Sequence, residues 1–168
     1  MFVDIDDDRS AANDHRGAVD EVTPATWEDS LAVNVRRHFF AIQAAVPMMR
    51  TAGGGSIVNL GSISWHVRLE GLPGYSTAKA GIEGLSRIMA RELGADAIRV
   101  NCIVPGWILT ERQQRLWLSA EVEADLMRSQ CLKELLGPAD VARLVLWVAA
   151  DDSRLCTGRN WVVDGGWM

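Results

Sequence analysis

The sequence lacks several features that would point to particular classes of protein. No apolar run in its 168 residues approaches the ~20 residues that a membrane-spanning helix needs. The three cysteines are odd in number and far apart, and the three histidines are equally dispersed, so neither set has the spacing of a metal site. The net charge of −5, with scattered basic residues, gives no sign of a nucleic-acid surface. We therefore expect no membrane span, no metal and no nucleic-acid partner.

The chain begins with acidic residues, which is the opposite of the basic start of a signal peptide. We therefore expect a cytoplasmic protein with reduced thiols. Residues 1–18 are polar and acidic and predict a poorly ordered lead-in. Hydrophobic residues make up 48% and charged residues 23% of the chain, as in ordinary soluble domains. Residues 19–168 are therefore expected to form one domain.

The hydrophobic pattern predicts helices that alternate with short strands. A helix is predicted to begin at Thr23-Pro24, and its inward face is expected to carry Leu31, Val35, Phe39, Ile42 and Val46. Strands are predicted at 56–60, 98–104 and 160–163. They are separated by a long helix that ends near Gly94, by a helical excursion over 107–136, and by a helix that begins at Gly137-Pro138.

Strands separated by helices of this length imply right-handed parallel crossovers and a doubly wound α/β sheet. The ligand site of such a sheet lies beyond the carboxyl ends of its strands. Ser62 and Pro105-Gly106 both fall at that edge.

The pair Tyr75 and Lys79 carries the strongest chemical signal. Residues four apart share one face of a helix, and an ammonium beside a phenol lowers the pKa of the phenol. A tyrosine that normally titrates near ~10 can then transfer protons near neutral pH. Ser62, thirteen residues upstream of Tyr75, is placed to hydrogen-bond the oxygen of a carbonyl or alcohol. The alternative interpretation is an amphipathic helix that merely exposes its Tyr and Lys.

Taken in order, these motifs resemble the short-chain dehydrogenase/reductase family from about Ala11 to Met168. The motifs are Asn34 in Leu31-Ala32-Val33-Asn34-Val35, Ser62, Tyr75-x-x-x-Lys79, Pro105-Gly106 with Thr110, and Asp164-Gly165-Gly166. A narrower resemblance, to bacterial NAD-dependent aldose 1-dehydrogenases of the D-xylose type, rests on residues 61–66, 79–84, 131–133 and 155–158. Asn13-Asp14 with Arg16 also resembles a loop of that group.

The resemblance implies four catalytic residues. Tyr75 would take the proton from a sugar's anomeric hydroxyl while hydride leaves to the nicotinamide of NAD, with NADP left open. Lys79 would lower the pKa of Tyr75 and bind the nicotinamide ribose, and Ser62 would orient the substrate oxygen. Asn34 would hold a water that links Lys79 to solvent.

The resemblance also implies two sets of binding residues. The cofactor-binding set is Tyr75, Lys79, Pro105, Gly106, Ile108 and Thr110. The candidate substrate contacts are Ser64, Trp65, His66, Trp107 and Gln113. Four of these residues have a plainer interpretation: Thr110 as a helix cap, Trp65 and Trp107 as packing residues, and His66 as a hydrogen-bonding loop residue. Cys102 is expected to be a small core residue.

The sequence departs from the family where the cofactor's pyrophosphate should bind. Family members begin with a strand, a G-x-x-x-G-x-G turn and a helix, followed by two further strands. Here Arg9-Ser10 occupy the first positions of the segment that follows those strands. The only glycine cluster, Gly53 to Gly55, precedes a strand and cannot cradle a phosphate at a helix start. We therefore expect a partial Rossmann-like sheet that lacks its first strands.

The missing strands also have a consequence for assembly. We expect an exposed sheet edge at Ile57-Val58, and hence a homo-oligomer, formed through the two long helices that the family uses for dimerisation.

Three functions stay open. The first is a sugar dehydrogenase, an NAD(P)-dependent oxidoreductase acting on a small molecule. The second is a reductase or dehydrogenase of another alcohol or ketone, such as a 3-oxoacyl thioester. The third is a catalytically inactive fragment that acts as an oligomerisation module. The first is favoured as the function of the protein, and activity of the 168-residue chain by itself is not expected.

Overall fold

The computed structural model describes residues 15–168. The predictions for Arg9-Ser10 and for Asn13-Asp14 lie outside the described residues, as does the prediction of a poorly ordered lead-in for residues 1–14.

The core of the molecule is a parallel three-stranded sheet in the order β1-β2-β3. The strands are β1 (Gly55–Leu60), β2 (Ile98–Pro105) and β3 (Asn160–Val163). Cys102 at the centre of β2 is in register with Asn59 on one side and Asn160 on the other. The sheet confirms the predicted α/β class and the three predicted strands. Among residues 15–168, β1 pairs with β2 alone.

One long helical segment precedes the sheet. It consists of α1 (Pro24–Leu31), a π-helical turn η1 (Ala32–Arg36) and α2 (Arg37–Thr51). The predicted start is confirmed, because Thr23 caps α1 and exchanges hydrogen bonds with Thr26. Ile42 and Val46 are buried as expected.

The prediction for Phe39 is wrong, because its side chain is 39% exposed and packs edge-to-face on Phe40. The π-helical turn inserts one extra residue into the helical repeat before α2, but Phe39, Ile42 and Val46 all lie after this turn, so the turn alone does not account for the exposure of Phe39.

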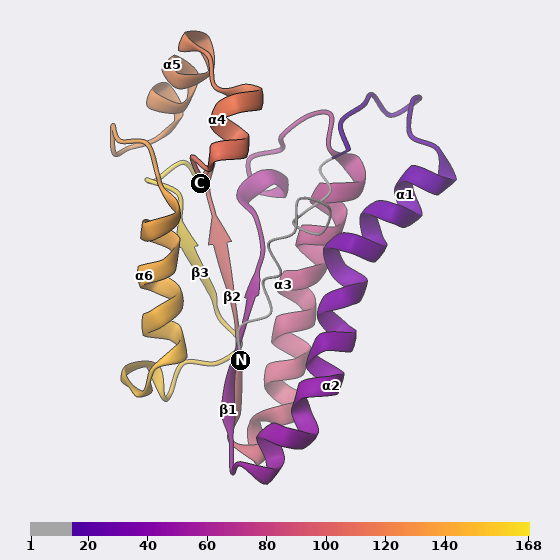
Figure 1. The fold of residues 1–168 in the computed structure, drawn as a ribbon, viewed down its shortest axis with the longest axis vertical. Helices are drawn as coiled ribbons and strands as arrows, with labels where there is room; N and C mark the ends of the chain where they lie inside the picture. Colours follow the sequence, from indigo (N-terminus) through magenta and orange to yellow (C-terminus); the bar gives the residue numbers. More distant parts are fainter. Residues whose placement is uncertain (1–14) are drawn as a thin grey trace.

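The sheet lies between two helical layers (Figure 1). Helices α2 and α3 (Pro73–Leu93) cover one face, and α6 (Pro138–Ala149) covers the other. Val100 and Val104 of β2 are completely buried, as are Ile82 of α3 and Val148 of α6. Helix α3 ends at Leu93, as predicted from Gly94. The buried central strand therefore fixes the position of the elements on both faces.

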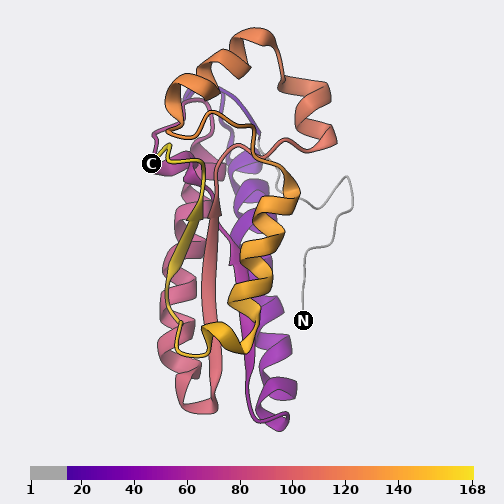
Figure 2. The same cartoon turned by 90° about the vertical axis from the view of Figure 1, so that its left-hand side faces the viewer.

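The carboxyl ends of the strands point toward a separate pair of short helices (Figure 2). These are α4 (Glu111–Trp117) and α5 (Ala120–Ser129), which confirm the predicted helical excursion. Three single 3-10 turns complete the described chain: η2 (Ile63–Trp65), η3 (Gly94–Asp96) and η4 (Asp151–Ser153).

Arg99 of β2 holds the end of α6 against the opposite end of the sheet. Its guanidinium donates to the carbonyl oxygens of Val148, Ala149 and Ala150 and to the hydroxyl of Ser153. The last carbonyls of a helix have no partner within the helix, so one side chain satisfies several of them at once.

Candidate active site

The candidate site is built where β1 ends. Ser62 follows the strand after one residue and caps the turn η2, because its hydroxyl accepts a hydrogen bond from the amide of Ser64 at 3.1 Å. Gly61 permits this exit, since a Cβ there would lie 2.9 Å from the sulfur of Cys102. The short link therefore places the Ser62 side chain at the carboxyl edge of the sheet, as the sequence predicts.

Tyr75 and Lys79 lie one turn apart at the start of α3. The ammonium nitrogen of Lys79 is 5.6 Å from the centre of the Tyr75 ring. The same ammonium donates to the carbonyl oxygen of Leu60, the last residue of β1, at 2.9 Å. Lys79 is only 5% exposed, so the interpretation of a surface Tyr–Lys pair is wrong for the lysine. This one cation therefore joins the end of β1 to the helix that carries the phenol.

Asn34 lies in the π-helical turn and is completely buried. Its amide donates to the carbonyl of Ser30 at 3.0 Å. Helix α1 approaches α3 closely here, because a Cβ on Gly74 would lie 2.9 Å from the Ser30 side chain. The close contact brings the π-helical turn beside the start of α3 that carries Tyr75. π-Helical turns inside α-helices are frequent at functional sites, and sequence periodicity gives no signal for this one.

His38, one turn after Asn34, is a half-buried histidine that the sequence pattern does not single out. Burial, and then the positive charges of Lys79 and Arg37, lower the pKa of His38 from 6.5 to about 4. Its Nδ1 is buried without a hydrogen-bond partner among the described residues. Asn34 and His38 are four residues apart, a spacing that places two residues on one face of a helix, and this is the only sequence signal that could have pointed to His38.

The end of β2 meets the turn that follows β3. A Cβ on Gly106 would lie 2.8 Å from the Cα of Asp164, so only glycine allows the two segments to touch. The Asp164 carboxylate accepts hydrogen bonds from the amides of Gly166 and Met168 at 2.8 and 2.7 Å. The predicted Asp164-Gly165-Gly166 motif therefore packs directly against the predicted Pro105-Gly106 turn.

The residues after Gly106 lead into α4. Ile108 forms an isolated parallel bridge with Leu136. Thr110 is the N-cap of α4 and accepts from the amide of Gln113, which confirms the plainer interpretation of a cap. The amide oxygen of Gln113 is buried and has no hydrogen-bond partner among the described residues. Trp107 is half-buried. The cofactor and substrate roles of these residues stay predictions.

Trp65 and His66 share one buried acceptor, Glu83. The indole nitrogen of Trp65 donates to Glu83 Oε1 at 2.8 Å, and His66 Nε2 lies 2.9 Å from the same oxygen. The prediction that His66 is a hydrogen-bonding loop residue is confirmed. The prediction that the two rings contact a sugar stays a prediction, and neighbouring Ser64 is 3% exposed. Glu83 was missed, although its spacing of four residues from Lys79 puts both on one helical face.

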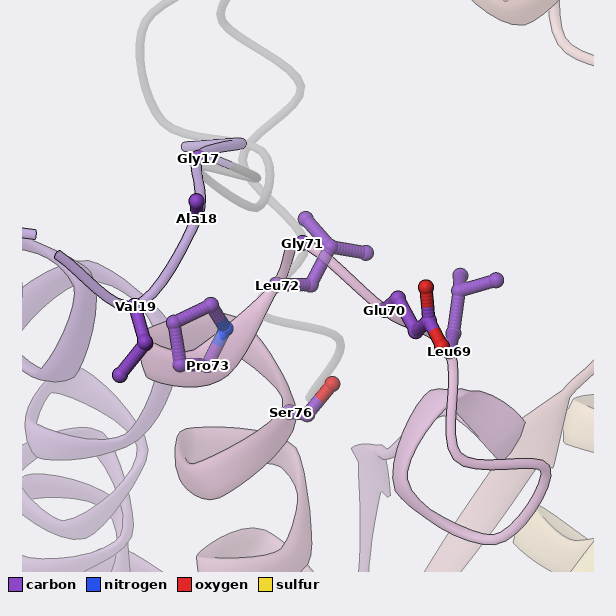
Figure 3. A pocket seen from close by; sticks show the side chains of 9 residues that line it. All are labelled: Gly17, Ala18, Val19, Leu69, Glu70, Gly71, Leu72, Pro73 and Ser76. Carbon is purple, nitrogen blue, oxygen red and sulfur yellow. The ribbon is translucent and has the colours of Figure 1, made fainter. Parts of the chain in front are cut away.

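A pocket of about 300 Å³ lies beside the start of α3, and its lining is almost entirely apolar. Figure 3 shows the pocket between residues 17–19, residues 69–73 and Ser76. None of the predicted site residues lines it. The pocket is therefore a neighbour of the Tyr75 helix and not the site itself.

Two kinds of feature are absent from residues 15–168. No three His, Cys, Asp or Glu side chains in this range lie close enough to hold a metal ion. No helix within it is long and apolar enough to cross a membrane.

The geometry agrees with comparisons to known proteins. The family described as enoyl-(acyl carrier protein) reductase matches residues 9–168. The D-xylose 1-dehydrogenase of Caulobacter vibrioides is 50% identical over 158 residues, which cover 94% of this chain and 63% of that protein. "Probable galactose dehydrogenase GalD" of Rhizobium meliloti is 48% identical, with 94% and 61% covered. The chain thus spans a little under two thirds of the length of these relatives.

Solved structures give the same result. A short-chain type dehydrogenase/reductase from Mycobacterium ulcerans superposes with a TM-score of 0.87 at 30% identity, covering 90% of this chain and 55% of that one. A 4-hydroxyisoleucine dehydrogenase complexed with NADH superposes with a TM-score of 0.89 at 27% identity, covering 95% and 66%. The chain belongs to the short-chain dehydrogenase/reductase family, which confirms the resemblance read from its motifs.

Proposed function

We propose that this chain is the catalytic portion of an NAD(P)-dependent oxidoreductase that acts on the CH–OH group of a small molecule, and that the small molecule is a sugar. The sugar assignment is supported by the names of two relatives near 50% identity, a D-xylose and a galactose dehydrogenase. NAD is the favoured cofactor, because one structural neighbour is complexed with NADH. A cytoplasmic homo-oligomer is part of the same proposal.

One observation carries the proposal. The Lys79 ammonium is buried between the end of β1 and the Tyr75 ring. A cation beside the ring favours the ionised form of the phenol. Ser62 lies two residues beyond the carbonyl that holds Lys79. A proton acceptor, its activating cation and a hydroxyl that can orient an alcohol therefore come from adjacent segments.

The described residues fit the nicotinamide end of the cofactor. Lys79, Tyr75 and Thr110 would hold its ribose and carboxamide, with the backbone at Ile108. The buried amide oxygen of Gln113, which lacks a partner among residues 15–168, lies in the helix that Thr110 caps, where a bound polar group would satisfy it. The sequence contains no G-x-x-x-G-x-G turn for the pyrophosphate.

The chain's own residues would handle the proton. NAD(P), when bound, supplies the acceptor for the hydride of the substrate C–H bond. Ser62 would orient the substrate hydroxyl, and the phenolate oxygen of Tyr75 would take its proton as the carbonyl forms. Lys79 would stabilise the ionised phenol, and Asn34 would support the exit of the proton toward solvent.

A cofactor titration followed by a turnover assay tests the proposal. NADH binding is measured by quenching of, and energy transfer from, the seven tryptophans. Oxidation of D-xylose and galactose is then followed with NAD and with NADP. The proposal requires saturable binding at micromolar NADH, and turnover that is lost in Tyr75→Phe and Lys79→Met but kept in Lys133→Met. Because the sequence contains no turn for the pyrophosphate, this result also requires a second chain that completes the cofactor site. A folded chain that binds neither cofactor would overturn the proposal for this chain.

Two other functions have their own support. A 3-oxoacyl-[acyl-carrier protein] reductase from Brucella melitensis superposes with a TM-score of 0.85 at 31% identity, covering 95% of this chain and 60% of that one. Preferential turnover of a 3-oxoacyl thioester in the same assay would favour that class.

An oligomerisation module is supported by exposed apolar side chains on the outer helices, with Phe40 50%, Met48 60% and Ile88 62% exposed. Light scattering after size-exclusion chromatography measures the oligomeric state. A stable oligomer that binds no nucleotide would favour the module over the enzyme.

A further inference from the structure

Glu83 is a buried carboxylate at the junction of three separate elements. It lies on α3 one turn after Lys79 and is 5% exposed. Its Oε1 accepts from the indole of Trp65 at 2.8 Å and lies 2.9 Å from His66 Nε2. Its Oε2 accepts from the side-chain amide of Asn160, the first residue of β3. Three polar groups from two other segments therefore converge on one side chain.

The convergence has an energetic reason. A buried carboxylate is costly unless several donors satisfy it, and hydrogen bonds to an ionised acceptor are roughly twice as strong as neutral ones. The donors are 17 and 18 residues away in one direction and 77 in the other. These hydrogen bonds therefore form no local turn but link the segment after β1, helix α3 and strand β3.

The link acts on the residues that the proposed function uses. The turn η2 begins immediately after Ser62 and contains Trp65, and the Trp65 ring stacks on His66 with centroids 3.7 Å apart. Glu83 lies on the helix that carries Tyr75 and Lys79. Any displacement of Trp65 and His66 relative to α3 would therefore shift Ser62 relative to Tyr75.

The thiol of Cys102 and the side chain of Asn160 lie near the same junction. Burial raises the pKa of the Cys102 thiol to about 12, and the nearby Glu83 carboxylate raises it in the same direction. Asn160, which pairs with Cys102 in the sheet, also has a buried side-chain oxygen without a partner among the described residues.

We propose that Glu83 is a positioning residue, which holds the segment beginning at Ser62 in register with the helix that carries Tyr75 and Lys79. The inference deepens the proposed function and rests on it for its catalytic consequence. It also gives Trp65 and His66 a structural role, because they are the partners through which Glu83 holds the segment.

The test compares Glu83→Leu, Glu83→Gln and the control Glu92→Leu in the full chain. Glu92 is exposed near the end of the same helix. Leucine matches the volume and removes both acceptors. In Glu83→Gln the side-chain carbonyl oxygen still accepts from Trp65 and His66. If the side-chain amide of Asn160 turns over, its oxygen, which lacks a partner among the described residues, can accept from the new NH₂ group. Glu83→Gln is therefore the conservative variant, and it should keep the hydrogen-exchange rates and the kcat close to those of the wild type.

The first measurement is hydrogen exchange by NMR of the Trp65 indole and of the Ser64 amide, which donates to Ser62. Trp65→Phe assigns the indole signal. We expect both to exchange about tenfold faster or more in Glu83→Leu, and close to the wild-type rate in Glu83→Gln and Glu92→Leu. If Glu83→Leu does not fold, Trp65→Phe removes the indole donor of the same hydrogen bond to Glu83. The Ser64 amide of that variant should then exchange faster than in the wild type.

The second measurement is steady-state kinetics with the NADH dissociation constant. We expect kcat to fall about 10- to 100-fold in Glu83→Leu, since small misplacement of reacting groups has effects of this size, with NADH affinity kept. An unchanged Ser64 exchange rate in a folded Glu83→Leu chain would overturn the inference. So would faster exchange with unchanged kcat. Faster exchange in a chain whose wild type shows no turnover would instead refute the proposed function and leave the link established.

Discussion

The half-buried histidine His38 gives a quantitative prediction for the stability of the fold against pH. Its pKa is lowered from 6.5 to about 4, first by burial and then by the charges of Lys79 on α3 and Arg37 on its own helix. The folded state therefore binds a proton at His38 less readily than the unfolded state does. Stability from neutral His38 is fully present above about pH 6.5 and is lost as the pH falls toward 4.

The magnitude follows from the two pKa values. Each pH unit between them corresponds to about 1.4 kcal/mol, so the interval from 6.5 to about 4 gives a loss of about 3 kcal/mol as an upper estimate. This is a large fraction of the total stability of a small domain, which is about 5–15 kcal/mol. The fold should therefore weaken markedly in mild acid.

Urea unfolding of wild type and His38→Gln, followed by circular dichroism from about pH 7 to about pH 4, measures the effect. The glutamine is polar and of similar size but does not titrate. Carboxylates contribute equally to both proteins, so the difference between the two free energies of unfolding isolates His38. His15→Gln is the control, because His15 is an exposed histidine. Parallel curves for wild type and His38→Gln would refute the reasoning.

Three further results are expected. Cys131 is exposed and should react with a thiol reagent in the folded chain, whereas buried Cys102, whose pKa is raised to about 12, should react only on unfolding. Arg99→Ala should lower the free energy of unfolding by about 2–4 kcal/mol, because several carbonyls at the end of α6 lose their donor. Gly106→Ala should cost about 1–3 kcal/mol, because the new Cβ would clash with the Asp164 backbone.

Matched variants control these three experiments. Cys131→Ala should remove the fast-reacting thiol, and Cys102→Ala should leave it. Arg87→Ala removes an exposed arginine of α3 and should change the stability little. Gly84→Ala adds a Cβ where no atom lies within 4 Å, so it should be neutral or slightly stabilising in a helix. Equal losses in the Gly106 and Gly84 variants would contradict the close contact with Asp164.

Much of the architecture follows from local sequence. The strands at 56–60, 98–104 and 160–163 were predictable because short apolar runs between helices require a buried parallel sheet. The start of α1 at Pro24 and the end of α3 before Gly94 were predictable because caps act within a few residues.

The same locality explains the catalytic motif. The side-by-side placement of Tyr75 and Lys79 was predictable because a spacing of four residues is a property of one helical turn.

Tertiary structure decided the rest. The π-helical turn at Asn34 and the exposure of Phe39 depend on how the long helical segment packs against its neighbours. The burial of Lys79 against the carbonyl of Leu60, the lowered pKa of His38 and the donors around Glu83 join residues that are far apart in the chain. Sequence periodicity reports which face of an element is apolar. Only the folded chain decides which polar groups meet behind that face, because a buried charge is stable only where distant segments bring its partners.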